Sequence, residues 1–234
     1  MDGVLLLGGP TASGKSDAAV ELAQQYDAEI VGADSRQIYR DMPVGTAAPT
    51  KAQRAAVPHH LVAFLDPYER YSAARFAIDA MRAIRNIRAR GRRAIVAGGT
   101  GFYLRALAGG VALAAQYDEA LRDRLAREAS VHSAQTLHDW LASLDPSRAA
   151  AVDPSDRYRV VRALEVRLAG SPERDEPLPT LRSEKIPFAY AWLDVPLEEL
   201  DARIGTRVGA MIDAGFVAEA ERVGLRAAAS SAVG

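Results

Sequence analysis

Near its amino terminus the chain reads Gly9-Pro10-Thr11-Ala12-Ser13-Gly14-Lys15-Ser16. These residues follow the short apolar run from Val4 to Leu7 and precede residues 17–26, which have the length and composition of a helix. Gly, four residues and Gly-Lys-Ser between a strand and a helix is the pattern of a phosphate-binding loop. Backbone N–H groups and the helix N-terminus surround the phosphate, the lysine adds positive charge, and the serine hydroxyl can bind Mg²⁺. Such a loop accepts any di- or triphosphate.

Short apolar runs and helical patterns alternate beyond this loop. Residues 28–33 and 93–97 predict two further strands, and residues 41–58 read as a long irregular connection. Ser72 is a suitable cap for a helix running to about Arg90, with an apolar stripe of Ile78, Met81, Ile84 and Ile87. The alternation predicts an α/β fold of the P-loop NTPase-like kind, a parallel sheet flanked by helices. Ligands then bind at the carboxyl ends of the strands.

A helical pattern replaces the strands from about Tyr117. Leucines at 137, 141 and 144 predict one helix, and Val161, Leu164 and Leu168 another. The Pro-rich, polar stretch 170–187 reads as a mobile segment, residues 188–195 as a returning strand, and Leu200, Ile204, Val208 and Met211 as the stripe of a last helix. We therefore predict a core of residues 1–116 and 188–234, with residues 117–187 as an inserted helical subdomain.

Composition limits the possible classes of protein. The 234 residues are 49% hydrophobic and 25% charged, which predicts a soluble globular protein. The sequence lacks a run of roughly 18 apolar residues and a secretory signal, so we expect a cytoplasmic protein without a membrane partner. The absence of cysteine excludes disulfides, thiolate metal sites and a cysteine nucleophile. The net charge of −1 does not exclude a nucleic-acid partner, because binding depends on where charges lie.

An acidic residue and a second glycine-rich turn follow the next two predicted strands. Asp34 ends the strand 28–33, where its carboxylate is suited to act as a general base or, alternatively, to cap a helix. The strand 93–97 ends in Gly98-Gly99-Thr100-Gly101, without the aspartate that holds Mg²⁺ in many phosphate-loop NTPases. An NTP-hydrolysing enzyme is therefore disfavoured.

A series of motifs together resembles the tRNA dimethylallyltransferase family. It comprises the phosphate loop, Ala-Asp-Ser-Arg-Gln-Ile-Tyr at residues 33–39, Gly45-Thr46-Ala47, Pro58-His59-His60-Leu61, and Gly-Gly-Thr-Gly-Phe-Tyr at residues 98–103. The series continues through Leu144-Asp145-Pro146, residues 159–166, and Arg207 with Met211. The match keeps its order and covers almost all of the chain. The family pattern continues past Gly234 into further helices and a basic, aromatic segment.

The resemblance implies transfer of a dimethylallyl group from dimethylallyl diphosphate to the N6 amine of an adenosine next to the anticodon in tRNA, with release of pyrophosphate. It implies that residues 9–16 bind the donor diphosphate and that Asp34 orients and deprotonates the amine. Thr100 and Arg207, with Lys15, would stabilise the departing pyrophosphate, helped by Mg²⁺ on Ser16. Arg203 lies one helical turn from Arg207, so either is placed to reach a phosphate, or both form a solvated basic face.

The resemblance also implies a set of tRNA contacts, because the stacked adenine must be extruded before it reacts. These residues are Asp34, Ser35, Arg36, Gln37, Thr100, Tyr158, Arg159, Val160, Val161 and Arg162. Two of them depart from the family pattern: Arg36 replaces a residue that is often apolar, and Tyr158 replaces a usual Gln. Arg159 and Arg162 have the alternative of an ordinary charged helix surface. We expect a monomer that binds the anticodon loop through the helical segment.

Two other functions stay open at this point. A phosphate-loop kinase of a small metabolite would consume ATP, but it lacks the acid after the third predicted strand. An isopentenyltransferase acting on free adenine nucleotides would use the same donor site. The long helical segment 117–187 favours a bulky RNA acceptor over a free nucleotide.

Overall fold

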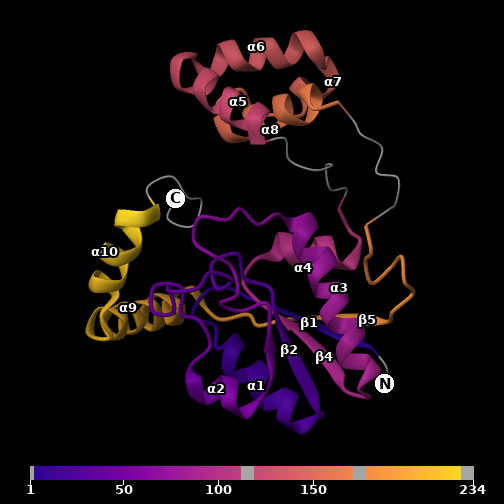
Figure 1. The fold of residues 1–234 in the computed structure, drawn as a ribbon, viewed down its shortest axis with the longest axis vertical. Coiled ribbons are helices and arrows are strands. Elements are labelled where there is room, and N and C mark those ends of the chain that lie inside the picture. Colours follow the sequence, from indigo (N-terminus) through magenta and orange to yellow (C-terminus); the bar gives the residue numbers. More distant parts are fainter. Residues whose placement is uncertain (1–2, 112–118, 171–177, 228–234) are drawn as a thin grey trace. The chain divides into compact units, whose positions relative to one another are not determined.

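The structure is a computed structural model that describes residues 3–111, 119–170 and 178–227. Within these ranges, parallel strands form one five-stranded sheet in the order β3-β2-β4-β1-β5 (Figure 1). The strands are β1 (Val4–Gly8), β2 (Ala28–Gly32), β3 (His59–His60), β4 (Arg93–Ala97) and β5 (Phe188–Trp192). In register, Leu6 of β1 pairs with Val96 of β4 and Tyr190 of β5. The predicted parallel α/β sheet is confirmed, and the carboxyl ends of its strands lie at one edge.

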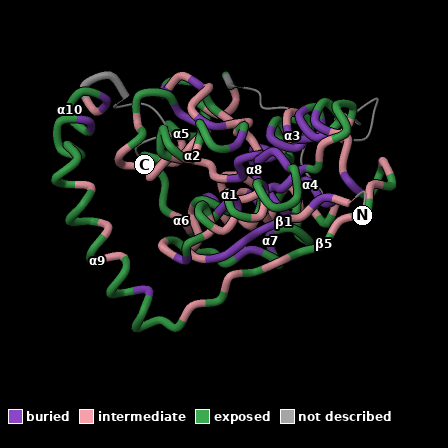
Figure 2. Tube along the Cα trace, turned by 90° about the horizontal axis from the view of Figure 1, so that it is seen from below, coloured by how far each residue is buried: buried purple, intermediate pink, exposed green. Residues whose placement is uncertain are grey.

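Helices cover both faces of this sheet, so its central strands are buried (Figure 2). On one face, Ala19 and Ala23 of α1 (Lys15–Gln25) pack against Leu7, Ile30 and Ile95. The helices α3 (Ala73–Ala89) and α4 (Gly101–Ala108) contact the strands β1, β2 and β4 and each other. Burial on both faces is why the strands read as continuous apolar runs in the sequence.

The predicted cap of α3 is confirmed, but its apolar stripe needs one correction. Ser72 Oγ accepts a hydrogen bond from Arg75 N at 3.1 Å. Met81, Ile84 and Ile87 are fully buried, whereas Ile78 is 44% exposed. Spacing of three residues drifts backwards around a helix of 3.6 residues per turn, so Ile78 lies on the side opposite Ile87. Phe76 and Ala80 complete the buried face instead.

The connection predicted as irregular between residues 41 and 58 contains a helix, α2 (Lys51–Ala56). Thr50 and Gln53 form a reciprocal capping box at its start: Thr50 Oγ1 accepts from Gln53 N, and Gln53 Oε1 accepts from Thr50 N. The following residues His59 and His60 form β3, which pairs with Ile30 and Val31 of β2. The prediction was therefore wrong for residues 51–56.

The chain divides into two compact units, residues 1–112 with 178–234 and residues 113–177. The second unit holds α5 (Glu119–Val131), α6 (Ala134–Leu144), α7 (Pro146–Ala150) and α8 (Arg157–Leu168). Its core includes Leu125, Leu137, Leu141, Val160 and Leu164. The predicted helices α6 and α8 are confirmed, whereas the sequence pattern missed α5 and α7.

The boundary between the units differs from the predicted one. Residues 178–187 were assigned to the helical segment, but they pack on the first unit, where Leu181 is fully buried and its N–H donates to Leu107 O at 2.9 Å. Residues 171–177, part of the segment predicted to be mobile, lie outside the described residues.

Two helices follow β5 in the described chain, α9 (Leu197–Asp213) and α10 (Phe216–Ala227). The helix predicted from the stripe 200–211 is confirmed as α9, but of that stripe only Leu200 is buried, and Val208 is 49% exposed. Over the described ranges, the helices are all too short or too polar to cross a bilayer.

Candidate active site

The phosphate loop joins β1 to α1 at the carboxyl edge of the sheet. Gly14 adopts φ 85° directly before the helix, a left-handed conformation that glycine adopts without strain. The Lys15 ammonium donates hydrogen bonds to Pro10 O and, at 3.3 Å, to Ser13 Oγ. Ser13, whose hydroxyl accepts one of these bonds, is almost fully buried. The predicted strand, loop and helix arrangement is therefore present.

The pKa of Lys15 reflects the charges that surround the loop. Burial lowers the pKa of the Lys15 ammonium, the nearby Asp34 carboxylate opposes this shift, and the positive charge of Arg207 adds to it. These three side chains come from the phosphate loop, the end of β2 and the middle of α9. The structure thus brings three predicted site residues into one electrostatic neighbourhood.

Asp34 begins a tight turn after β2. The backbone N–H groups of Arg36 and Gln37 donate to its Oδ1 at 2.9 and 3.4 Å. The other oxygen, Oδ2, faces Gly99, since a Cβ built on that glycine would lie 3.5 Å from it. The carboxylate therefore caps a turn through one oxygen and presents the second toward the neighbouring glycine-rich turn.

Thr100 links that glycine-rich turn to the turn of Asp34. It stands at the N-cap of α4, yet its hydroxyl makes no capping bond. Instead, Ser35 N donates to Thr100 Oγ1 at 2.9 Å, and the two hydroxyls lie 3.3 Å apart. A threonine hydroxyl at an N-cap normally satisfies its own helix. The diverted bond holds Thr100 beside the turn of Asp34.

Gly98 allows the two turns to approach this closely. A Cβ at this position would lie 2.1 Å from the carbonyl oxygen of Ala33. On either side of it, Ala33 N donates to Ala97 O and Thr100 N donates to Ala33 O. The glycine-rich turn is visible in the sequence, but the close approach that requires Gly98 is a tertiary contact that no local pattern signals.

Two arginines of α9 reach the phosphate loop. Arg207 Nη1 donates to Thr11 Oγ1 at 3.1 Å, and Arg203 Nη1 donates to Ala12 O at 3.4 Å. Arg203 is also paired with Glu199 through Nη2 at 2.6 Å. Both side chains therefore contact the phosphate loop, although Arg203 is also exposed to solvent.

Ser16, the predicted Mg²⁺ ligand, is an exposed residue in the first turn of α1. Among the described residues, no group of three or more histidine or acidic side chains is arranged to hold a metal ion. Mg²⁺ commonly takes only one or two ligands from the protein and the rest from substrate phosphates and water. A serine hydroxyl beside a phosphate cradle fits that mode.

The residues predicted to contact tRNA lie in both units. In the first unit, Arg36 is exposed, Ser35 is half-buried, and Gln37 Nε2 donates to the carbonyl oxygens of Thr46 and Ala47. Gln37 therefore holds a neighbouring loop through its amide nitrogen. Asp34, Ser35, Gln37 and Thr100 form one cluster.

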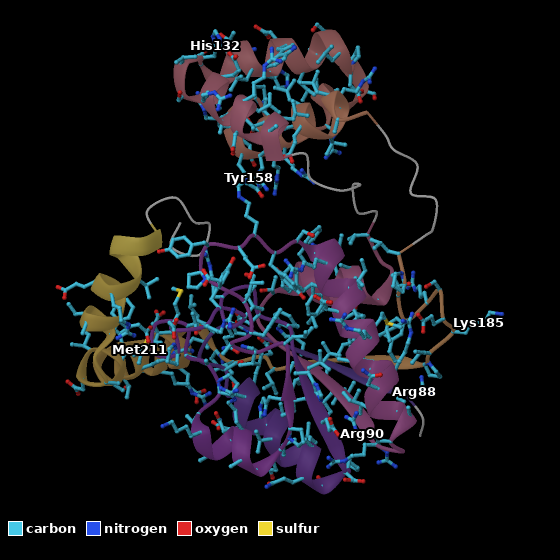
Figure 3. All side chains as sticks on the ribbon, viewed as in Figure 1. Arg88, Arg90, His132, Tyr158, Lys185 and Met211 are labelled. Carbon is cyan, nitrogen blue, oxygen red and sulfur yellow. The ribbon has the colours of Figure 1, made fainter. Side chains whose placement is uncertain are left out.

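On α8 of the second unit, Tyr158 is 73% exposed (Figure 3), and Arg159 pairs with Asp156 at 3.3 Å. Arg162 pairs with the buried Glu165 at 2.6 Å. Val160 is fully buried in the core of the helical unit, and Val161 packs against that core. Because its side chain faces inward, Val160 cannot contact tRNA through that side chain as predicted.

Comparison with known proteins identifies the family. The IPP transferase family model matches residues 37–234, and the isopentenyl transferase model matches residues 2–58. The tRNA dimethylallyltransferase of Anaeromyxobacter dehalogenans (strain 2CP-C) is 48% identical over 224 residues, which are 95% of this chain and 75% of that protein. The tRNA dimethylallyltransferase of Burkholderia ambifaria (strain MC40-6) is 45% identical, with coverages of 92% and 68%.

Solved structures give the same result. The tRNA isopentenylpyrophosphate transferase of Bacillus halodurans is 34% identical, with a TM-score of 0.66 over 100% of this chain and 74% of its own. A eukaryotic dimethylallyltransferase acting on tRNA is 29% identical, with a TM-score of 0.74 over 94% of this chain and 55% of its own. The chain therefore belongs to the tRNA dimethylallyltransferase family.

Proposed function

We propose that this protein transfers a dimethylallyl group from dimethylallyl diphosphate to the N6 amine of the adenosine next to the anticodon in tRNA, releasing pyrophosphate. Family membership supports the class of reaction. One observation carries the assignment of the site: the ammonium of Lys15 lies within electrostatic reach of both the Asp34 carboxylate and the Arg207 guanidinium. A base and a phosphate-binding group on opposite sides of one reacting carbon are what this substitution requires.

The donor diphosphate would occupy the phosphate loop. Its negative charge would be stabilised by the N-terminus of α1 and by the backbone N–H groups of residues 9–16 other than Pro10, which has none. Lys15 and Arg207 would add two cations. The Ser16 hydroxyl, with diphosphate oxygens, would hold Mg²⁺, which when bound neutralises part of the charge on the pyrophosphate. Leaving-group stabilisation therefore comes from the β1–α1 loop and from α9.

The acceptor adenosine would face Asp34. As the amine nitrogen bonds to the allylic carbon, the bond from that carbon to the diphosphate oxygen breaks, and the amine proton passes to the Asp34 carboxylate. Thr100 fixes the turn that carries this carboxylate through its bond with Ser35 N. If the Asp34 carboxylate were not held in place, the reacting groups would lose the near-attack geometry on which such a reaction depends.

The proposed RNA contacts are the Asp34–Gln37 turn and, on α8, the exposed side chains of Tyr158 and Arg159 with the half-buried Arg162. The adenine must leave its stack, and an exposed aromatic side chain such as Tyr158 is suited to stack on an unpaired base. Because one chain supplies Lys15, Asp34, Thr100 and Arg207, we propose that a monomer is active. A tRNA substrate implies a cytoplasmic location.

Labelled dimethylallyl diphosphate with Mg²⁺ tests this proposal. The acceptors are an unmodified tRNA, the same tRNA with guanosine in place of the adenosine next to the anticodon, and AMP. We expect label on the first acceptor alone. Label on AMP and none on tRNA would select a nucleotide prenyltransferase, and ATP consumption without label transfer would select a kinase.

A further inference from the structure

A short loop, Met42–Ala48, lies beside the turn of Asp34. It is closed by its own hydrogen bonds: Thr46 Oγ1 donates to Met42 O at 2.7 Å, and Ala48 N donates to Pro43 O at 3.0 Å. Gln37 Nε2 donates to the carbonyl oxygens of Thr46 and Ala47 at 3.3 and 3.0 Å. The amide nitrogen of Gln37 therefore binds this loop at two carbonyl oxygens, and the position of the loop determines the orientation of that side chain.

The other side of the Met42–Ala48 loop is held by Glu219 of α10. Its carboxylate accepts hydrogen bonds from Val44 N at 2.9 Å and Gly45 N at 2.7 Å. Glu219 is only 4% exposed. Burying a carboxylate is costly unless it is hydrogen-bonded, and bonds between a charged acceptor and backbone N–H groups are stronger than neutral ones. The two bonds are thus a specific attachment of α10 to the loop.

Two neighbouring residues on the same face of α10 reinforce this attachment. Phe216 packs on Gly45 so closely that a Cβ on the glycine would lie 2.7 Å from the aromatic ring. Arg222 Nη2 donates to Asp41 O, just before the loop, at 3.4 Å. Residues three apart lie on one helical face, so Phe216, Glu219 and Arg222 act on the loop together.

The contacts form a continuous path from α10 to the reacting carboxylate. Glu219 binds Val44 and Gly45, the loop binds the Gln37 side chain, and Gln37 N donates to Asp34 Oδ1. We propose that Glu219 is a positioning residue: by fixing the Met42–Ala48 loop it orients Gln37 and Asp34 toward the acceptor adenosine. This inference rests on the proposed function, because it assigns the acceptor to that turn. Glu219 has no role in donor binding.

The test replaces Glu219 by Gln, which keeps the shape but turns one acceptor oxygen into a donor that faces a loop N–H. We expect amide hydrogen exchange at Val44 and Gly45 to accelerate about tenfold, as for loss of one hydrogen bond to a charged group. We also expect kcat/KM for tRNA to fall about tenfold, with an unchanged dissociation constant for dimethylallyl diphosphate. Glu221→Gln, at an exposed position of the same helix, is the matched control and should behave as wild type.

A second pair of variants displaces the Met42–Ala48 loop without changing any charge. Gly45→Ala should reproduce the tRNA defect because its Cβ displaces the Phe216 ring, and Gly45→Ala with Phe216→Ala should recover part of the activity. Unchanged exchange at Val44 and Gly45 in Glu219→Gln would overturn the proposal. So would an equal loss of donor and tRNA affinity together with a lowered melting temperature, which indicates a general structural role. Failure of the proposed function looks different, since the wild-type protein itself would then label no tRNA.

Discussion

Arg207 Nη1 donates a hydrogen bond to Thr11 Oγ1 at 3.1 Å, which ties α9 to a phosphate loop 196 residues earlier in the chain. Arg203, one turn before it, is held by Glu199 and by the carbonyl oxygen of Ala12. A diphosphate oxygen is a better acceptor than a neutral hydroxyl, so Arg207 would gain a stronger bond with a donor bound as proposed. Arg203 would have to give up an existing ion pair. The two arginines therefore have different expected roles.

Replacing Arg207 by Ala should lower kcat by about 10²–10³-fold, the usual loss when one group that stabilises transition-state charge is removed. Arg203→Ala is the matched control on the same helix, and its kcat should fall less than tenfold. Single-turnover transfer of the dimethylallyl label to tRNA measures both. Equal losses in the two variants would contradict the distinction.

Asp34→Asn should lower kcat by about 10²–10⁴-fold, because the amide retains its shape but accepts no proton. The oxygen of Asn can still accept from the N–H groups of Arg36 and Gln37, so the turn should persist. The dissociation constant for dimethylallyl diphosphate, measured by titration calorimetry, should stay within about twofold of wild type. Near-normal turnover would remove Asp34 from the role of base.

The sequence was sufficient to predict features whose cause is local. The phosphate loop, the Ser72 cap and the apolar strands are encoded within a few residues of themselves. The placement of Asp34 and Thr100 at one edge of the sheet also followed, because the carboxyl ends of parallel strands share an edge, but their direct neighbourhood did not. The capping box of Thr50 and Gln53 was an equally local signal for α2 that the composition of its surroundings obscured.

Features that depend on distant contacts could not be predicted in this way. The glutamate at 219 reads as an ordinary acidic residue in the first turn of a helix, and only the tertiary structure brings it to Val44 and Gly45. The inward direction of Val160 was also hidden, because a motif match names positions without showing which face of α8 is buried. Local sequence patterns determine the helices and strands, whereas tertiary packing determines which side chains come into contact.

Gly98→Ala should separate the two turns of the acceptor site. The new Cβ would meet the Ala33 carbonyl at 2.1 Å, and backbone cannot move aside as a flexible side chain does. Overpacking of this kind costs about 1–3 kcal/mol, which lowers the melting temperature of a chain of this size by several degrees. Transfer to tRNA should fall with it. Gly99→Ala, whose Cβ would lie 3.5 Å from Asp34 Oδ2, is the control and should keep the wild-type melting temperature.

Lys15→Met tests the cost of the half-buried ammonium at the phosphate loop. Burial is the main cause that lowers the pKa of Lys15 from its usual 10.5. Between the folded and unfolded pKa values the unfolded chain binds more protons, so the stability of the wild-type protein rises with pH in that interval. At neutral pH the variant avoids the cost of burying the charge. It should therefore melt at a higher temperature than the wild type without ligand, and this difference should shrink as the pH approaches 10.5.

Ligand binding should reverse this order of stability. Pyrophosphate that binds the loop of the folded protein should raise the melting temperature of the wild type. The variant lacks the cation proposed to contact pyrophosphate and should gain much less. Thermal melts from neutral pH to pH 10.5, with and without pyrophosphate, measure both effects. Lys51→Met, at an exposed position in α2, should follow the wild type throughout. A less stable, pyrophosphate-responsive Lys15→Met protein would show that the ammonium supports the loop structurally and does not serve the diphosphate.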